Sequence, residues 1–348
     1  MYAILKNEFD DNHLHWIKSC EKFAVKYIVI DFTAHNWVAQ IKANDKSWSG
    51  FLVCPSGRQS IFKDLYDERL MLLNQWYNPK MFFPSLPEVL LHENKKYLSY
   101  WLEFNNLPCP KTWVFYDSEE ALQFVTESSR EILVGKVNIG ASGKGVRVLR
   151  GAQAQMDYVK KAFSEGLTQS WGPNLAMGGW MPRLRKLITQ PGRILKRLKV
   201  YNINRQEVQR GFVLLQEYIP HEFEWRVVRI GDSFFGHRKI KQGDKASGTK
   251  GIDYTAPSEE LLNFTEHLTN KFGFHCMAID LFEDGNGGYL INEMQCIFGH
   301  VQPFICELNG EPGRFVRDSS GWKFEQGFFN TNLSYDLRLE YFISSRLQ

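Results

Sequence analysis

A glycine-rich loop that contains one lysine is the first stretch able to bind phosphate. Its residues are Gly140, Ala141, Ser142, Gly143, Lys144 and Gly145. A P-loop ends in Gly-Lys-Ser/Thr and leads directly into a helix. Here a glycine follows the lysine, and the next residues, Val146 to Leu149, alternate as a strand does. The sequence therefore predicts a hairpin and not a P-loop. The pattern alone fits a plain turn, but backbone N–H groups in such a hairpin can also cover a triphosphate.

Oxygen-bearing side chains in the C-terminal half have the spacing of a magnesium site. Glu293 and Gln295 are two residues apart in a predicted strand, so their side chains point to one face. Asp280 lies on the preceding predicted strand, across the turn 284–288. Mg²⁺ prefers hard oxygen ligands. These three residues are candidate metal ligands, although lone carboxylates are more often surface groups.

Basic residues on another predicted hairpin can neutralise charge. Phosphoryl transfer to a carboxylate spreads negative charge over several oxygens, which guanidinium and ammonium groups complement. The candidates for this catalytic role are Arg226, Arg238 and Lys239. A simpler alternative for Arg226 is an ion pair with Glu224, which would contribute little to stability. We expect the histidines to be structural or satisfied polar groups; these are His237, His275 and His300.

The elements that must position these residues follow a clear order. The first part alternates strands and helices, which predicts a small parallel α/β unit; the helices are expected at 14–23 and 60–74 and the strands at 26–31 and 50–55. A helix at 94–105 ends before the prolines of Leu107 to Thr112. The remaining helices are expected at 118–128, 152–164 and 259–272, and the first of these is capped by Ser118. The remaining strands are expected at 113–116, 211–217, 224–230, 233–240, 275–282 and 289–293.

Composition and charge narrow the class of protein. The 348 residues are 43% hydrophobic and 23% charged, as in soluble globular proteins. A formal net charge of +3 is too small to indicate a nucleic-acid partner. Six cysteines stand singly without metal-ligand spacing, which favours buried, reduced thiols. No signal peptide and no apolar run of about 20 residues is present, so a cytoplasmic location is expected.

Residues 166–206 form a basic segment without any acidic residue. We consider three interpretations. The segment is a solvated insertion, a patch for an acidic or phosphorylated acceptor, or an interfacial element that contacts a membrane through residues 183–199. The sequence does not decide among them.

The order of these motifs resembles the ATP-grasp superfamily of carboxylate–amine ligases. The resemblance covers about residues 94–302, and Asn94-Lys95 with the proline-containing segment fits the pattern that precedes the lid. It implies an α/β (α+β) fold in three parts. These are an N-terminal α/β domain at 1–93, a linker helix and central lid with the basic insertion at 94–215, and a C-terminal domain with an antiparallel sheet and the metal site at 216–348.

The resemblance also implies roles for single residues. Lys136 would meet the α-phosphate and adenine, and Lys95 would join the nucleotide site. The loop from Gly140 to Gly145 would cover the β- and γ-phosphates, and Val146, which follows it, is also a candidate for nucleotide binding. The adenine hinge would be Gln216, Glu217, Tyr218 and Ile219, with Glu224 or Glu222 on the ribose. The metal ligands would be Asp280, Glu293 and Gln295, holding two magnesium ions that Mn²⁺ can replace. Family members usually have asparagine where this chain has Gln295.

The implied reaction is ADP-forming amide synthesis. ATP would phosphorylate a carboxylate, and an amine would attack the acyl phosphate. The tail after Gln295 resembles ATP-grasp proteins of bacterial surface-polysaccharide synthesis, which implies a uronic-acid-type sugar or glycan precursor as substrate. Two alternatives stay open: a peptide-modifying or amino-acid ligase, and a nucleotide-binding module without turnover. A kinase that leaves a stable phosphorylated product is a third variant, and the oligomeric state is left open.

Overall fold

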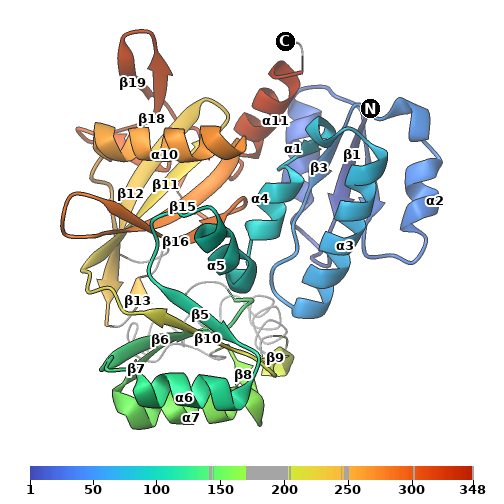
Figure 1. Ribbon diagram of the computed structural model, residues 1–348. Coiled ribbons are helices and arrows are strands. Elements are labelled where there is room, and N and C mark those ends of the chain that lie inside the picture. The colour runs from blue at the N-terminus through green and yellow to red at the C-terminus, as the bar shows by residue number, and fades with distance from the viewer. Residues whose placement is uncertain are drawn as a thin grey trace, which may run out of the picture. The chain divides into compact units, whose positions relative to one another are not determined.

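The computed structural model describes residues 1–140, 143, 145–169, 203, 205–243, 245–246, 251–300 and 302–346. The chain divides into two units. The first unit consists of Met1–Gly57, Ile61–Lys111 and Ile219–Gln348, and the second of Arg58–Ser60 and Thr112–Tyr218. Figure 1 labels their elements.

A parallel sheet opens the first unit. Its strands lie in the order β2-β1-β3-β4, and their bounds are β1 (Tyr2–Lys6), β2 (Tyr27–Asp31), β3 (Gly50–Val53) and β4 (Phe82–Phe83). Parallel neighbours need crossover connections, which are supplied by α1 (Leu14–Lys22), α2 (Trp37–Lys42), η1 (Asp45–Ser47), α3 (Ser60–Trp76) and η2 (Pro79–Met81). The strands and helices expected here are present, and the structure adds β1 at the very start.

Both faces of this sheet are buried because successive side chains alternate between them. Ala3 and Leu5 belong to a core with α2 and α3. Ile4 belongs to a second core with α1 and the C-terminal helix α11 (Tyr335–Ser344). The last helix of the chain therefore packs against the first strand, where the ring centroids of Phe342 and Tyr2 lie 6.0 Å apart, and Figure 1 shows it beside α1.

An antiparallel sheet forms the rest of the first unit. Its main order is β16-β15-β11-β12-β18-β17, with β13, β14 and β19 attached at its side. The bounds are β11 (Phe223–Ile230), β12 (Ser233–Gln242), β13 (Lys245–Ala246), β14 (Ile252–Asp253), β15 (Cys276–Glu283), β16 (Tyr289–Gln295), β17 (Cys306–Leu308), β18 (Glu311–Asp318) and β19 (Gly321–Gln326). The helices α5 (Lys95–Phe104) and α10 (Glu259–Phe272) bury one face of it through a shared apolar cluster.

A buried carboxylate joins the short helix that follows β4 to this sheet. Glu88, in α4 (Leu86–Leu91), accepts hydrogen bonds from the backbone N–H and hydroxyl of Ser85 at 2.8 and 2.7 Å. Its other oxygen accepts the backbone N–H groups of His275 and Cys276 at 2.8 and 2.6 Å. Burial raises the pKa of Glu88, and these hydrogen bonds oppose the rise. The side chain thereby fixes the start of α4, and the segment that follows it, against β15.

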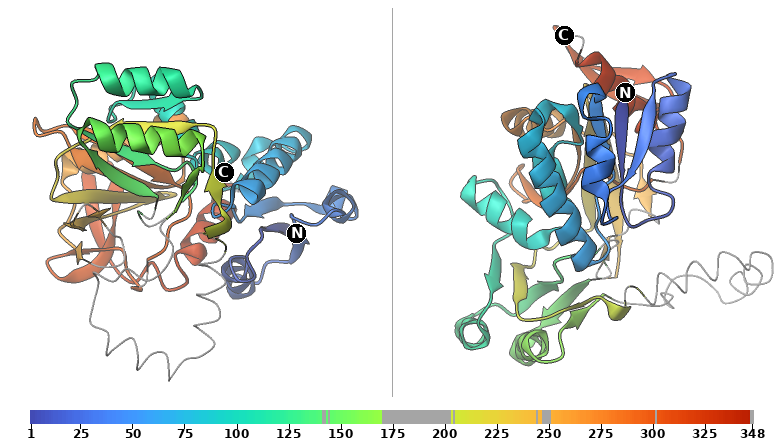
Figure 2. Two further views of the ribbon diagram at one scale, coloured as in Figure 1. Left: turned by 90° about the horizontal axis from the view of Figure 1, so that it is seen from below. Right: turned by 90° about the vertical axis from the view of Figure 1, so that its right-hand side faces the viewer.

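The second unit contains an antiparallel sheet in the order β5-β10-β6-β7. Its strands are β5 (Thr112–Phe115), β6 (Ile132–Lys136), β7 (Val146–Arg150) and β10 (Val213–Glu217). The helices α6 (Ser118–Glu127) and α7 (Gly151–Phe163) share an apolar core with the sheet. Figure 2 shows the two helices side by side over one face. A short ribbon of β8 (Leu167–Thr168) and β9 (Val208–Gln209) completes the described part of the unit.

The cap of α6 differs from the prediction. Asp117, and not Ser118, precedes the helix with an extended backbone, and its carboxylate accepts the N–H groups of Glu119 and Glu120 at 2.9 Å each. Ser118 is already helical. An aspartate in that position also places negative charge at the helix N-terminus.

Two predictions fall partly or wholly on residues that the structure does not describe. Most of the basic segment 166–206 lies outside the described residues, and its proposed membrane-contact stretch 183–199 lies there entirely. Among the helices of the described residues, none has the length and apolar character needed to cross a bilayer.

Candidate active site

One face of the antiparallel sheet carries the predicted charged residues in register. Arg226 on β11 stands opposite Asp280 on β15, and Asp280 stands opposite Glu293 on β16. Paired residues share a face, and Gln295 joins them because it lies two residues further along β16. The residues next to these along the strands, such as Trp225, point to the opposite face, into the apolar core. Strand register, and not sequence proximity, assembles this row.

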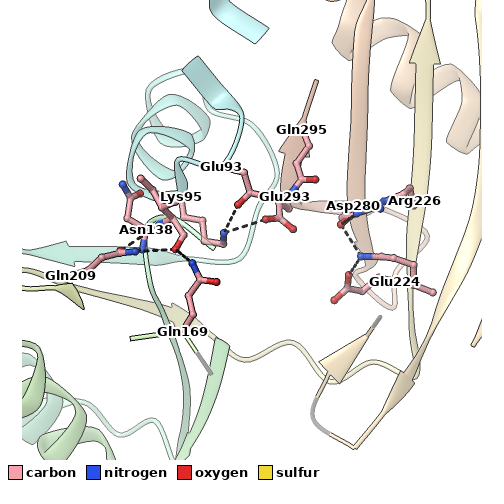
Figure 3. Close-up of polar contacts among 12 residues, drawn as sticks. Glu93, Lys95, Asn138, Gln169, Gln209, Glu224, Arg226, Asp280, Glu293 and Gln295 are labelled. Atoms are coloured by element: carbon pink, nitrogen blue, oxygen red, sulfur yellow. Dashed lines mark hydrogen bonds and ion pairs between the residues drawn. The ribbon is translucent and has the colours of Figure 1, made fainter. Parts of the chain in front are cut away.

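Asp280 is the centre of a buried ion network (Figure 3). Arg226 donates to both of its oxygens, from Nε at 2.7 Å and from Nη2 at 2.8 Å. Lys239 donates to Asp280 at 2.7 Å and to Glu224 at 2.5 Å. Only 2% of Asp280 is exposed. Arg226 is therefore paired with Asp280, and Glu224 is paired with Lys239, so the simple Arg226–Glu224 pair is not formed.

The network keeps Asp280, Arg226 and Lys239 charged. Burial alone would raise the pKa of Asp280, but Arg226 and Lys239 outweigh it and hold that pKa well below its usual range. Burial likewise opposes the charges of the two cations, and the carboxylates outweigh it, so the pKa values of Arg226 and Lys239 are raised. The face therefore presents fixed charges at neutral pH.

We expect Asp280→Asn to destabilise the protein strongly. The substitution keeps the side-chain shape but leaves two buried cations with one carboxylate, Glu224. Breaking a buried pair on one side typically costs about 3–5 kcal/mol. Urea denaturation measures this loss, and Asp64→Asn on the exposed side of α3 is the matched control. A loss below about 1 kcal/mol for Asp280→Asn would contradict this role of the network.

A second charged cluster surrounds Lys95. Its Nζ lies 3.3 Å from Glu293 Oε1 and 3.8 Å from Glu93 Oε2. Burial would lower the pKa of Lys95, but the two carboxylates outweigh it and raise that pKa. Gln295 donates from Nε2 to Glu93 Oε1 at 3.0 Å. Two side chains from residues 93–95 and two from β16 therefore form one polar group (Figure 3).

Glu93 is the member of this cluster that sequence reasoning missed. It has a positive φ of 50°, which is rare for a residue other than glycine. A Cβ at Gly57 would lie 2.7 Å from Glu93 Cγ, so only glycine leaves room for the side chain. The role of Glu93 depends on contacts with residues about two hundred positions away, and no local motif marks it.

The three candidate metal ligands would suit a metal that arrives with phosphate. Among the described residues, no group of three or more His, Cys, Asp or Glu side chains could hold a metal ion alone. Both oxygens of Asp280 already accept hydrogen bonds. Mg²⁺ usually binds one or two carboxylates and completes its shell with phosphate and water. Glu293, Gln295 and Asp280 therefore fit that kind of site and not a preformed metal centre.

Lys136 and the glycine loop belong to the second unit. Lys136 ends β6, opposite Leu214 on β10 and Val146 on β7, and is 7% exposed. Gly143 has a φ of 65°, and a Cβ at Gly145 would lie 2.0 Å from Val137 Cγ2, so both positions require glycine. The predicted hairpin is present. Within it, Ala141, Ser142 and Lys144 lie outside the described residues.

The predicted adenine hinge spans the end of β10. Gln216 is 7% exposed and donates to Thr112 Oγ1 at 3.0 Å. The chain passes from the second unit to the first between Tyr218 and Ile219, one residue after β10 ends at Glu217. In the first unit, the Ile219 carbonyl accepts a hydrogen bond from His221 Nδ1 at 2.7 Å.

The two ribose candidates differ in environment. Glu222 is exposed, and its carbonyl accepts the N–H of Lys241 at 2.8 Å. Glu224 is 9% exposed, and its carboxylate is engaged by Lys239. A ribose hydroxyl that bonded Glu224 would therefore share it with that lysine.

Arg238 does not join Arg226 and Lys239. It stands opposite Trp225 and so lies on the other face of the sheet. Its guanidinium stacks over the rings of Phe223 and Trp225, at 4.4 and 4.7 Å from their centroids, and lies 3.8 Å from Asp253. The structure thus brings together two of the three predicted cations around Asp280.

Comparisons with known proteins identify the fold. The sequence matches no protein-family model and no curated protein. D-cycloserine synthetase DcsG is similar in structure, with a TM-score of 0.54 at 12% identity over 100% of this chain and 99% of that one. A RimK domain protein ATP-grasp from Sphaerobacter thermophilus has a TM-score of 0.51 at 14% identity over 84% of this chain and 89% of its own.

The ADP complex of purK, N5-carboxyaminoimidazole ribonucleotide synthetase, gives the same result. Its TM-score is 0.51 at 14% identity, over 89% of this chain and 71% of that one. Identities this low show the fold alone. The mixed α/β chain therefore has the ATP-grasp fold, as the order of its sequence motifs predicted.

Proposed function

We propose that the protein is an ATP- and Mg²⁺-dependent ligase that joins a carboxylate to an amine. The observation that carries this proposal is the row of Arg226, Asp280 and Glu293 across three neighbouring strands. Lys239 is bonded to Asp280 in the middle of the row, and Lys95 lies 3.3 Å from Glu293 at one end. Phosphoryl transfer needs fixed positive charge and oxygen ligands on one rigid surface. A sheet supplies that rigidity better than loops do.

Nucleotide binding is assigned to both units. In the second unit, Lys136 would meet the α-phosphate, the loop from Gly140 to Val146 would cover the β- and γ-phosphates, and Gln216 to Tyr218 would hold adenine. In the first unit, Ile219 would continue the hinge, and Glu224 or Glu222 would bind the ribose. The ADP in the purK structure supports a nucleotide for this fold. We also propose three domains, an N-terminal domain at 1–93, a linker helix with the lid at 94–215 and a C-terminal domain at 216–348.

Glu293, Gln295 and Asp280 would hold magnesium, as two ions that Mn²⁺ can replace. When bound, the metal neutralises charge on the phosphates. Lys95 would keep Glu293 oriented, since it already contacts that carboxylate at 3.3 Å. Among the described residues, Arg226 Nη1 has no hydrogen-bond partner, so it can donate to a phosphate or to the substrate carboxylate.

The proposed reaction has two steps. A carboxylate oxygen attacks the γ-phosphorus, the bond to the β,γ-bridging oxygen breaks, and ADP leaves. The amine nitrogen then attacks the acyl carbon, the carbon–oxygen bond to phosphate breaks, and the amine loses a proton. The products are an amide, ADP and inorganic phosphate. The enzyme mainly orients the reactants and offsets charge.

We propose a uronic-acid-type sugar, or a glycan precursor that carries one, as the first carboxylate to test. This choice is supported by the resemblance of the sequence after Gln295 to proteins of surface-polysaccharide synthesis. A peptide or amino-acid substrate is the main alternative on the same scaffold.

One observation favours a second candidate function, a nucleotide-binding module without turnover. Arg226 and Lys239 occupy both oxygens of Asp280 in the structure, which weakens it as a metal ligand. Such a module would bind ATP and leave it intact with every acceptor.

The deciding experiment measures nucleotide release. Pure protein is incubated with ATP and Mg²⁺, with and without pooled sugar acids, peptides, amino acids and amines, and the products are identified by mass spectrometry. ADP that appears only when a carboxylate and an amine are both present supports the ligase. A stable phosphorylated product without an amine would indicate a kinase, and ATP that is bound but intact in every pool would favour the binding module.

A further inference from the structure

Two buried glutamines hold the segment that enters the glycine loop. Gln209, on β9, accepts the backbone N–H groups of Asn138 and Ile139 at 2.5 and 3.3 Å and donates to the Ile139 carbonyl at 2.9 Å. Gln169, directly after β8, donates to the same carbonyl at 3.0 Å. All four contacts lie within the second unit, and Figure 3 draws them. Two side-chain amides therefore satisfy three backbone groups of two consecutive loop residues.

The glutamines are themselves fixed in place. Gln169 is 4% exposed and Gln209 is 6% exposed. Leu167, which pairs with Gln209 across the ribbon, is buried in the core of the unit. A Cβ at Gly140 would lie 2.9 Å from Gln169 Cδ, so a side chain at this position would collide with the amide. The ribbon therefore forms a rigid support under the loop entry.

The exit of the loop has a different support. Val137 donates its N–H to the Gly145 carbonyl at 3.0 Å, which continues the β6–β7 ladder. Asn138 and Ile139 lie beyond that ladder, so their backbone groups need partners from elsewhere. Lys136 is only two residues earlier in the chain. The glutamines thus fix the backbone between the proposed phosphate lysine and the proposed phosphate loop.

Order in this loop matters for phosphate binding. Glycine loses more conformational freedom on ordering than other residues do. A loop that must be ordered by its ligand binds that ligand more weakly than a preorganised loop does. Hydrogen bonds that fix the entry residues before the nucleotide arrives reduce this cost.

We propose that Gln169 and Gln209 are positioning residues that hold the entry of the glycine loop, Asn138 and Ile139, in place for the binding of the β- and γ-phosphates of the nucleotide. This inference rests on the proposed function. It assigns the pair a role that the proposed ligase needs but that neither the loop nor Lys136 provides. It also explains why polar side chains stand at this point of the ribbon, since apolar ones would leave three backbone groups of Asn138 and Ile139 without these partners.

The test compares nucleotides that differ only in phosphate number. Binding of ATP, ADP and AMP, each with Mg²⁺, is measured by calorimetry for the wild type, Gln209→Leu and Gln169→Leu. We expect Gln209→Leu to weaken ATP and ADP binding by about 10- to 100-fold, because it removes three hydrogen bonds. Gln169→Leu removes one, so we expect a loss of about 3- to 10-fold. AMP affinity stays within about 2-fold in both, since AMP lacks the phosphates that the loop covers.

Further variants separate positioning from folding. Gln209→Asn keeps the amide on an arm one methylene shorter, so its ATP affinity falls between those of wild type and Gln209→Leu. Gln153→Leu, on exposed α7, removes one hydrogen bond to Asp157 and serves as the unaffected control. Unchanged AMP binding also reports an intact fold.

Two results would overturn the inference in different ways. The positioning role alone is overturned if the wild type binds ATP and both leucine variants bind it with unchanged affinity. It is also overturned if the variants lose as much affinity for AMP as for ATP. Wild-type protein that binds none of the three nucleotides overturns the proposed function, and the positioning role with it.

Discussion

Glu293→Ala is expected to abolish nucleotide turnover, lowering the rate by about 10³-fold or more, while the fold stays intact. Glu293 is proposed as a metal ligand and stands opposite Asp280 in the sheet. Its side chain is 23% exposed, so its loss creates no closed cavity. Lys95 keeps Glu93 as a partner at 3.8 Å, which limits the cost to stability. ADP release measures the rate, and the urea midpoint measures the fold.

Lys136→Ala is expected to cause the same loss, because the proposed α-phosphate contact disappears. Glu311→Ala, at the exposed start of β18, is the matched control and keeps wild-type turnover. If either Glu293→Ala or Lys136→Ala retained full turnover, the site assignment would be wrong. Loss of turnover with loss of fold would instead place Glu293 among the structural carboxylates, beside Asp280.

The free energy of unfolding is expected to fall by about 4–5 kcal/mol between pH 7 and pH 5. Three buried histidines are responsible. Burial, reinforced by nearby cations, lowers the pKa of His92 to about 3, of His237 to about 3 and of His300 to about 4. The cations are Lys63 and Lys95 for His92, and Arg226 for the other two.

The sign follows from proton uptake. Each histidine has an ordinary pKa of 6.5, so below that pH the unfolded chain binds protons that the folded protein refuses. Stability is therefore complete above about pH 6.5 and is lost progressively as the pH falls toward 4. At pH 5 each histidine contributes about 2 kcal/mol of loss. Burial raises the pKa of Asp67 to about 6, which acts in the opposite direction and offsets about 1 kcal/mol.

Urea denaturation at pH 7 and pH 5 measures this effect. His92→Gln should reduce the difference between the two pH values by about 2 kcal/mol. His267→Gln, on the exposed side of α10, should leave it unchanged. Equal stability at both pH values, or equal effects of the two variants, would contradict the role of buried histidines.

His237 also departs from the expectation of satisfied polar groups. Its Nδ1 lies 3.0 Å from the Ile305 carbonyl, which fixes the proton on Nδ1. Its Nε2 is buried and finds no hydrogen-bond partner among the residues that the structure describes. An imidazole with a buried nitrogen of this kind favours the neutral form, which is consistent with the lowered pKa of His237. Sequence alone gives no signal for this, because burial at residue 237 depends on packing from other elements.

The row of site residues could be predicted because its elements are local. Alternating side chains and a glycine-rich turn identify β15 and β16, and the two-residue spacing of Glu293 and Gln295 puts both on one face. The same rule could have separated Arg238 from Lys239. Adjacent residues in a strand point to opposite faces, so only one of these two could face Asp280.

Contacts between distant segments could not be predicted. Glu93 meets Gln295, and Gln209 meets Asn138, through side chains that no motif marks. The packing of α11 on the first strands could not be predicted either, because an amphipathic helix does not specify which sheet it covers. In each case the partner is set by the tertiary fold, whereas the sequence pattern specifies only the element.

The most direct test of the proposed chemistry follows oxygen from the substrate carboxylate. A carboxylate that supports ADP release is labelled with ¹⁸O in both oxygens and is supplied with ATP, Mg²⁺ and an amine. Acyl phosphate formation followed by amine attack predicts that each released inorganic phosphate carries one ¹⁸O atom, in step with ADP and amide. Phosphate without label, or label that appears in AMP, would contradict activation of the carboxylate as an acyl phosphate.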